Sequence, residues 1–187
     1  MSIKTPICDF GKAAKSFELK STNNEIIKLN DVKGENGTLV MFICNHCPYV
    51  IAVIEDIVED CMNLETLGVN AIAICSNDSI NYPEDSFDKM IKFHKDYNFN
   101  FPYLLDETQE VAKNYGAVCT PDFFGYNKNL ELQYRGRIRE LKNLKSEKSD
   151  ESDLFKAMKQ IIKTNTGPKE QIPSMGCSIK WLDNQCI

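Results

Sequence analysis

An abrupt change of pattern between residues 39 and 61 constrains the fold more than any other feature of the chain. The run 39–43 is short, continuous and apolar, which is typical of a buried β-strand. From Pro48 onward the pattern becomes that of an amphipathic helix. The apolar residues at the spacing of one helix face are Val50, Val53, Ile54, Ile57, Val58 and Cys61. The acidic residues predicted for the opposite, solvent-facing side are Glu55, Asp56, Glu59 and Asp60.

The tetrapeptide Cys44-Asn45-His46-Cys47 lies where the predicted strand passes into the predicted helix. Unpaired N–H groups and partial positive charge at a helix N-terminus stabilise a thiolate and lower its pKa. Cys44, at the exposed end of the strand, is predicted to attack, and Cys47, about one turn along and more buried, to resolve the mixed disulfide. His46 can carry positive charge, which favours the thiolate and makes the couple more oxidising. A pair of this spacing can also be half of a zinc site, but its strand–helix context favours redox chemistry.

Length and composition limit the classes of function. A chain of 187 residues is most simply one domain, 1–187, with a core at about 15–165 and a tail at 166–187. The formal net charge of −5, with both signs interspersed, gives no support for nucleic-acid or membrane-surface partners. The N-terminus has no apolar signal segment and no run is long enough to cross a bilayer, so we expect a soluble cytoplasmic protein.

The remaining elements alternate along the chain. The expected segments are a hairpin at 17–29, a strand at 69–75, a helix from Pro83 to about Asn98, an extended segment at 101–105, a helix from Asp106 and Gln109 to Gly116, a hairpin at 122–135, a charged, mobile loop at 142–152, and a helix at 154–162 ended by Gly167-Pro168. This order predicts an α/β protein with a mixed sheet and helices on both faces. Ligands in such sheets gather at the carboxyl ends of strands, where Cys44 lies.

The eight cysteines are Cys8, Cys44, Cys47, Cys61, Cys75, Cys119, Cys177 and Cys186. With no secretory signal, they are interpreted as one redox pair plus buried or peripheral thiols. Cys61 and Cys75 continue apolar patterns and are expected in the core. Cys186 is expected to be exposed and incidental.

A second motif, Cys119-Thr120-Pro121, stands between the third predicted helix and the second hairpin. Together with the first motif it resembles the thioredoxin superfamily, over residues of about 15–165. The resemblance implies a thioredoxin fold in which Pro121 is the cis-proline facing the redox pair. It also implies that the backbone of Thr120 pairs with an incoming substrate strand.

Three segments, 42–50, 119–124 and 173–181, narrow the resemblance to the peroxiredoxin-like branch related to alkyl hydroperoxide reductase and thiol-specific antioxidant. Peroxiredoxins carry Thr three residues before the peroxidatic Cys, where this chain has Met41 before Cys44 and Cys44 before Cys47. That departure argues against peroxidase activity. The carboxylate that assists the resolving thiol in thioredoxins falls near Thr38, which cannot titrate, so no dedicated base is predicted.

Cys119 and Cys177 are candidate auxiliary redox residues. Cys119 adjoins the predicted cis-proline loop, although it fits equally a small core side chain. Cys177 lies in a segment rich in Gly, Ser and Pro, and we hypothesise that it forms a disulfide or relay with Cys119. A four-thiolate zinc site of Cys44, Cys47, Cys119 and Cys177 is an alternative, but it lacks a second closely spaced pair, so no metal or cofactor is expected.

The sequence thus predicts a thiol–disulfide oxidoreductase. Its catalytic residues would be Cys44, Cys47 and His46, and its partner would be held by Thr120 and Pro121. The expected partners are protein or small-molecule thiols and disulfides and a thioredoxin- or glutathione-type reductant. The alternatives are a thiol peroxidase with Cys177 as resolving thiol, and a metal-binding or redox-responsive interaction module. The superfamily resemblance alone does not separate them.

Overall fold

A seven-stranded mixed β-sheet forms the centre of the computed structural model, which describes residues 2–146 and 150–182. The strand order is β3-β2-β6-β5-β4-β8-β9. The strands are β2 (Glu18–Ser21), β3 (Ile26–Lys28), β4 (Gly37–Phe42), β5 (Val69–Cys75), β6 (Tyr103–Leu105), β8 (Asp122–Asn127) and β9 (Leu132–Tyr134). Strand β4 is parallel to β5 and antiparallel to β8. The two predicted hairpins are both present, as β2–β3 and β8–β9.

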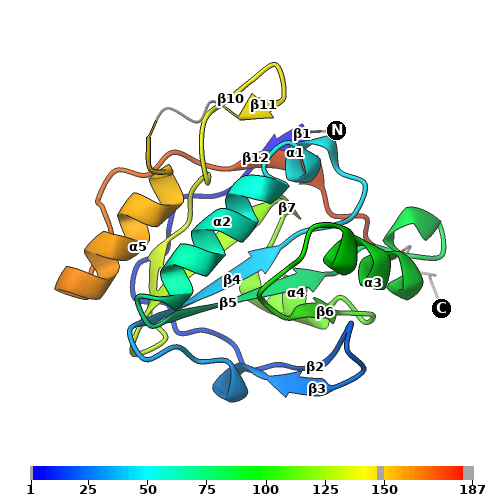
Figure 1. Cartoon of the computed structure of the whole chain (residues 1–187), viewed down its shortest axis with the longest axis horizontal. Helices are drawn as coiled ribbons and strands as arrows, with labels where there is room; N and C mark the ends of the chain where they lie inside the picture. Colours follow the sequence, from blue (N-terminus) through cyan, green and yellow to red (C-terminus); the bar gives the residue numbers. More distant parts are fainter. Residues whose placement is uncertain (1, 147–149, 183–187) are drawn as a thin grey trace.

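Strand β4 is buried on both faces because helices cover both sides of the sheet (Figure 1). Successive side chains of a strand alternate between faces. Leu39 and Met41 pack with α2 (Ile54–Glu65), α3 (Phe87–Asp96) and α5 (Asp153–Thr164). Val40 and Phe42 pack with α4 (Glu110–Tyr115) on the other face. The predicted mixed sheet with helices on both faces is confirmed.

The helix predicted from Pro48 is interrupted. Helix α1 covers Pro48–Ile51 and α2 covers Ile54–Glu65, because the N–H of Val53 bonds to the carbonyl of Val50, three residues back instead of four. The prediction of an exposed acidic face is also wrong at two positions, since Asp56 is 2% and Asp60 6% exposed. Groups from the segment between β9 and α5 cover them: Arg139 lies 3.4 Å from Asp56, and the hydroxyl of Ser152 donates to Asp60.

The predicted helix at 83–98 begins later and ends earlier than expected. Pro83–Asp85 is a 3₁₀ turn, and α3 starts only at Phe87 because Asp85 turns its side chain into the interior. His94 is partly buried at the edge of the core and shares a 2.6 Å hydrogen bond with Thr22. Burial lowers the pKa of His94.

The predicted start of the next helix is also shifted, because α4 begins at Glu110 rather than at Asp106. Asp106 does accept helix N–H groups, but from Val111 and Ala112, five and six residues on. Gln109 adopts a left-handed conformation (φ 63°), and its side chain leaves the helix to bond the carbonyls of Ser76 and Lys180. Gly116 ends the helix in a left-handed conformation, as predicted.

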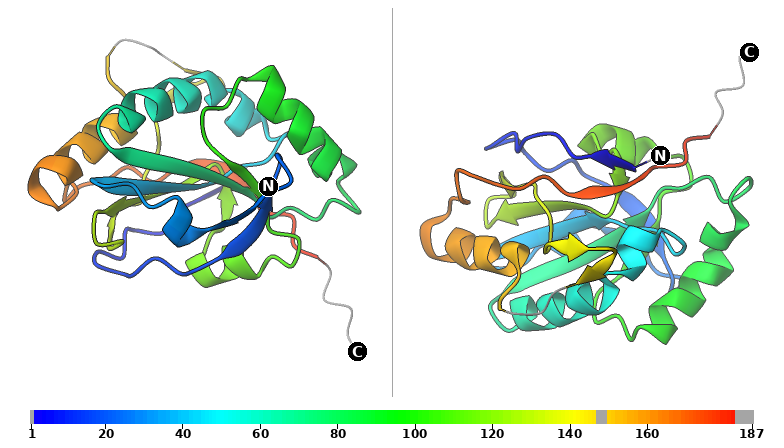
Figure 2. Two further views of the ribbon diagram at one scale, coloured as in Figure 1. Left: turned by 60° about the horizontal axis from the view of Figure 1, so that its bottom comes forward. Right: turned by 90° about the horizontal axis from the view of Figure 1, so that it is seen from above.

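A second sheet, of three strands, was not expected from the sequence (Figure 2). It joins β1 (Ser2–Lys4), β12 (Met175–Ser178) and β7 (Cys119–Thr120), with β12 in the middle. The C-terminal segment therefore packs along the loop that carries the second motif. None of the helices in residues 2–146 and 150–182 is long and apolar enough to cross a membrane.

The described part of the predicted charged loop at 142–152 contains regular structure. A two-stranded ribbon pairs β10 (Leu141–Lys142) with β11 (Lys145–Ser146), and Ser152 caps α5 by accepting the N–H of Phe155. The rest of that prediction, at 147–149, and the prediction for Cys186 lie outside the described residues.

Candidate redox site

The two cysteines of the first motif meet the second motif at a single residue, Thr120. Cys44 follows the carboxyl end of β4, and its Sγ lies 3.2 Å from Oγ1 of Thr120. Cys47 caps the N-terminus of α1, and its thiol donates to the carbonyl of Thr120 over 3.1 Å. The Thr120–Pro121 bond is cis. The fold therefore brings together the two motifs that stand more than seventy residues apart in the chain.

Neither thiol is open to solvent. Cys44 is 1% and Cys47 0% exposed, so the predicted difference in exposure between them is absent. Their environments do differ. Cys44 lies beside His46, whose side chain is 32% exposed, whereas Cys47 lies beside Cys177.

The two thiols share a hydrogen bond, and it moves their pKa values in opposite directions. The thiol of Cys44 donates to Cys47, and this bond, with the thiol and N–H of Cys177 and the N–H of Val50, lowers the pKa of Cys47 to about 5 despite burial. The same bond, burial and the charge of Asp85 raise the pKa of Cys44 well above that of a free thiol. The carbonyl of Thr120 accepts the proton of the Cys47 thiol and so favours its protonated form. The groups that favour the Cys47 thiolate are more numerous, and the pKa is lowered as a result. The sequence predicted that Cys44 would have the lowered pKa. In the structure the surrounding groups lower the pKa of Cys47 instead and raise that of Cys44.

The reduced protein is expected to hold one thiolate at neutral pH. Since the pKa of Cys47 is lowered to about 5, its thiolate absorbance at 240 nm should disappear as the pH falls through about 5. The same shift stabilises the reduced fold increasingly as the pH rises from there toward the ordinary thiol pKa. Replacing Cys44 with alanine removes the donated hydrogen bond and should raise the pKa of Cys47. A Cys61→Ala control should not change the transition, because burial keeps the pKa of Cys61 well above 9. A reduced protein without thiolate below pH 8 would contradict this prediction.

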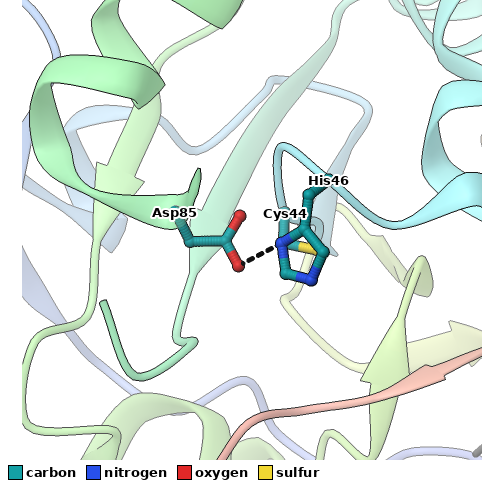
Figure 3. Close-up of side chains that lie close together, drawn as sticks. All are labelled: Cys44, His46 and Asp85. Carbon is teal, nitrogen blue, oxygen red and sulfur yellow. Dashed lines mark ion pairs between the residues drawn. The ribbon is translucent and has the colours of Figure 1, made fainter. Parts of the chain in front are cut away.

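His46 is held by Asp85 from the segment that precedes α3 (Figure 3). Nδ1 of His46 lies 2.8 Å from Oδ2 of the fully buried Asp85. The geometry is that of an ion pair rather than a hydrogen bond, because Nδ1 has no well-aligned acceptor among the described residues. When His46 is protonated, the carboxylate beside it offsets its charge, which weakens its predicted effect on the thiols.

Asp85 is the principal site residue that the sequence did not reveal. It accepts the backbone N–H of Asn45 over 2.8 Å and the amide of Asn77 over 2.7 Å, and thereby holds the first motif against the loop after β5. Tyr103 in β6 donates to Asn45 over 2.9 Å. The signal available in the sequence was the polar run 76–86 after the strand at 69–75, at the sheet edge that also carries Cys44.

Cys44, His46 and Asp85 also form a group whose ligand atoms all lie within 4.8 Å of one another. A thiolate, an imidazole and a carboxylate are donors that suit zinc, and three ligands leave a fourth position open. This group differs from the four-thiolate set considered from the sequence, with which it shares only Cys44.

The structure separates the two auxiliary cysteines that were predicted to pair. In the antiparallel pair β7–β12, Cys177 lies opposite Thr120 and Cys119 opposite Ser178. Directly paired residues share a face and neighbours alternate, so the side chains of Cys119 and Cys177 project to opposite faces. Cys119 is fully buried, in agreement with the interpretation as a small core side chain, and Cys177 instead contacts Cys47.

The predicted substrate edge of Thr120 is paired with the chain's own strand β12. An external strand cannot pair there while β12 is in place, which corrects the assignment of Thr120 to substrate pairing. Pro121 remains available from the other side. It lines a cavity of about 470 Å³ together with Tyr49, Arg137 and Met175.

Comparison with known proteins agrees with this geometry. Residues 10–141 match the model of the AhpC/TSA family. An uncharacterised conserved protein of Geobacillus kaustophilus is 38% identical, with a TM-score of 0.93 over 98% of this chain and 97% of that one. A hypothetical protein of Sinorhizobium meliloti 1021 is 33% identical, with a TM-score of 0.88 over 96% and 98% of the two chains.

A more distant structure extends the likeness of fold. The thioredoxin domain of a thiol-disulfide oxidoreductase of Bacteroides vulgatus is 15% identical, with a TM-score of 0.63 over 82% of this chain and 97% of that one. No curated protein matches the sequence. The predicted thioredoxin fold is thus confirmed, and the chain belongs to the AhpC/TSA family, as a peroxiredoxin-like protein of the thioredoxin superfamily.

Proposed function

We propose that this protein is a thiol–disulfide oxidoreductase whose redox couple is Cys44 and Cys47. The observation that carries the proposal is the shared contact of both sulfurs with Thr120, at 3.2 Å for Cys44 and 3.1 Å for Cys47. Two thiols that contact the same residue at the end of a buried strand need only a small movement to form a disulfide.

The reaction has two exchange steps. The thiolate of Cys44 attacks one sulfur of a partner disulfide, forms a mixed disulfide and releases the other partner sulfur as a thiolate. Cys47 then attacks the sulfur of Cys44, closes the Cys44–Cys47 bond and releases the second partner thiolate. Two electrons pass from the pair to the partner, and the reverse sequence oxidises a partner dithiol.

The roles follow from the surroundings of each sulfur. Cys44 lies within 4.8 Å of His46, whose side chain is 32% exposed, and we assign the first attack to it on that ground. Cys47 is enclosed, and the thiol and N–H of Cys177 and the N–H of Val50 still favour its thiolate in the second step, when Cys44 is bonded to the partner and has no S–H to donate. No titrating carboxylate stands at position 38, where thioredoxins carry the group that assists the resolving thiol. Thr38 is buried, and its hydroxyl accepts the N–H of Gly34. The raised pKa of Cys44 makes its attack the pH-sensitive step, and the rate should rise as the pH increases.

A redox titration tests the proposal. The protein is equilibrated in glutathione buffers of graded potential, its free thiols are alkylated, and its disulfides are mapped by mass spectrometry. We expect one reversible Cys44–Cys47 couple, on the oxidising side of the thioredoxin couple because the reduced form is stabilised by the Cys47 thiolate. Cys61→Ala should titrate like the native protein, since Cys61 is a buried residue of the α2 core. A native protein in which Cys44 and Cys47 never pair would overturn the proposal.

A thiol peroxidase is a second candidate, favoured by membership of the AhpC/TSA family and by the low pKa of Cys47. The thiolate would attack a peroxide oxygen, giving a sulfenic acid and an alcohol or water, and a second thiol would condense with the sulfenic acid and release water. The absence of Thr at the position three residues before either cysteine counts against it. Peroxide consumption coupled to a thiol reductant would distinguish the two activities.

A metal-binding role would use Cys44, His46 and Asp85 as ligands. Zinc that remains with the purified protein and protects Cys44 from alkylation would support that role. The exchange activity is favoured because both thiols, rather than one, meet at Thr120.

A further inference from the structure

The C-terminal strand β12 delivers a third thiol to the enclosed pair. Cys177 in β12 lies opposite Thr120, the residue that contacts both Cys44 and Cys47. Cys177 packs against the core cluster that contains Cys47, and it lies close enough for its thiol and N–H to lower the pKa of Cys47. Strands β1 and β12, which are far apart in the sequence, lie side by side in the second sheet, with β12 against β7 (Figure 2).

Strand β12 is built for close approach to this loop. A Cβ atom on Gly176 would collide with the carbonyl of Thr120, so glycine is required there for β12 to lie this near. On one side of Cys177, Ser174 donates to the carbonyl of Pro121 over 2.8 Å. On the other side, Ile179 is buried in the core, and the N–H of Lys180 bonds to Asn77 over 2.9 Å. Cys177 is thus anchored from both directions.

Exposure distinguishes the three thiols. Cys44 and Cys47 are buried, whereas Cys177 is half-buried and is the only cysteine in residues 2–146 and 150–182 that is not buried. A solvent thiol can therefore reach the sulfur of Cys177 more easily than either sulfur of the pair.

We propose that Cys177 is a third redox residue, which exchanges disulfides with Cys47 and connects the enclosed couple to an external thiol reductant. The proposal rests on the proposed exchange function of the pair. The deprotonated Cys177 attacks Sγ of Cys47 in the Cys44–Cys47 disulfide, forms a Cys47–Cys177 disulfide and releases Cys44 as the thiolate, which takes up the proton that Cys177 lost. The number of disulfides is unchanged, and Cys44 is free to react again.

The second disulfide is opened from outside. A dithiol reductant attacks the half-buried sulfur of Cys177, and the bond to Cys47 breaks. Cys47 leaves as the thiolate because a thiol of lower pKa is the better leaving group, and its pKa is about 5 against about 11 for Cys177, which burial and the neighbouring Cys47 raise. The reductant's second thiol then releases Cys177, and the reductant ends as a disulfide.

Two variants test this scheme. In Cys44→Ser, oxidised glutathione should convert Cys47 and Cys177 into one intramolecular disulfide, with two molecules of reduced glutathione released. In Cys177→Ser, the Cys44–Cys47 couple should still form, but its reduction by dithiothreitol should be slower by about tenfold or more, because only enclosed sulfurs remain. Ile26→Ala, which shortens an exposed apolar side chain of the edge strand β3 away from the site, is the control and should be reduced at the native rate.

The outcomes separate the two proposals. If Cys44→Ser is folded by circular dichroism but forms only glutathione adducts, or if Cys177→Ser is reduced at the native rate, the role of Cys177 is overturned while the couple stands. If Cys177→Ser and the native protein both fail to form the Cys44–Cys47 disulfide, the proposed function itself fails. Formation of a Cys119–Cys177 disulfide in the native protein would also overturn the relay, because the register places these side chains on opposite faces.

Discussion

Replacing Cys47 with serine is expected to abolish turnover with a model disulfide and to leave the partner attached to Cys44. Cys44 can still attack, but no thiol remains to close the pair and release the partner. The loss of turnover should be on the order of a thousandfold, as for other catalytic groups that act as a unit. Peptide mapping after incubation with oxidised glutathione should find an adduct on Cys44 that the native protein does not retain.

The same substitution should also make Cys44 more reactive toward iodoacetamide. The largest cause of the raised pKa of Cys44 is its hydrogen bond to the sulfur of Cys47. Serine offers no thiolate to accept that bond, so the pKa of Cys44 should fall in the variant. Cys61→Ala, which removes a buried thiol outside the site, should keep native turnover and collect no adduct. An adduct trapped instead on Cys47 in the reciprocal Cys44→Ser variant, with none on Cys44 in Cys47→Ser, would reverse the two roles.

Replacing Arg135 with methionine is expected to produce the largest loss of stability. Arg135 is 8% exposed, and its guanidinium bonds the fully buried Asp122 through Nη2 at 2.8 Å and Nε at 3.3 Å. A second Nη2 bond reaches the carbonyl of Gly116 over 2.7 Å. Removing one member of a buried ion pair leaves an unpaired buried charge, which costs about 3–5 kcal/mol of the free energy of unfolding. Urea denaturation monitored by fluorescence would measure this loss.

The loss of stability in Arg135→Met should depend on pH, and the substitution should also disturb the redox site. Burial raises the pKa of Asp122 and Arg135 opposes that rise, so the pKa increases further in the variant. A raised pKa in the folded state means that stability falls as the pH rises through it, so the variant should be less impaired in acid than at neutral pH. Asp122 directly follows Pro121, and weakening it should loosen the contact of Thr120 with both thiols.

An exposed ion pair provides the control. Lys28 lies 3.3 Å from Glu18, and both side chains are more than half exposed, so Lys28→Met should cost at most about 1 kcal/mol. The double variant Asp122→Asn with Arg135→Met should recover part of the loss, because no buried charge remains. Equal destabilisation by Arg135→Met and Lys28→Met would show that the buried pair does not hold the loop.

Much of the fold follows from local pattern. The continuous apolar run at 39–43 predicts a strand buried on both faces, and β4 is such a strand, because helices cover the sheet on each side. The hairpins and the strand at 69–75 are equally local, since alternation and turn residues act within a few positions. The fold predictions that failed include several element boundaries. Asp85 and Gln109, which precede α3 and α4, direct their side chains to distant partners instead of extending the helices.

The sequence by itself determined the two motifs, the type of chemistry that they carry and the family that they indicate. The tertiary structure decided which thiols meet. The pKa values of Cys44 and Cys47 depend on a mutual hydrogen bond, on Asp85 and on Cys177, and the pairing of β12 with β7 sets which face each cysteine occupies. These effects act through space between residues far apart in the chain, and a one-residue change of register would exchange Cys177 for its neighbour. No local pattern carries that information, because it exists only once the two ends of the chain are packed against the loop of Pro121.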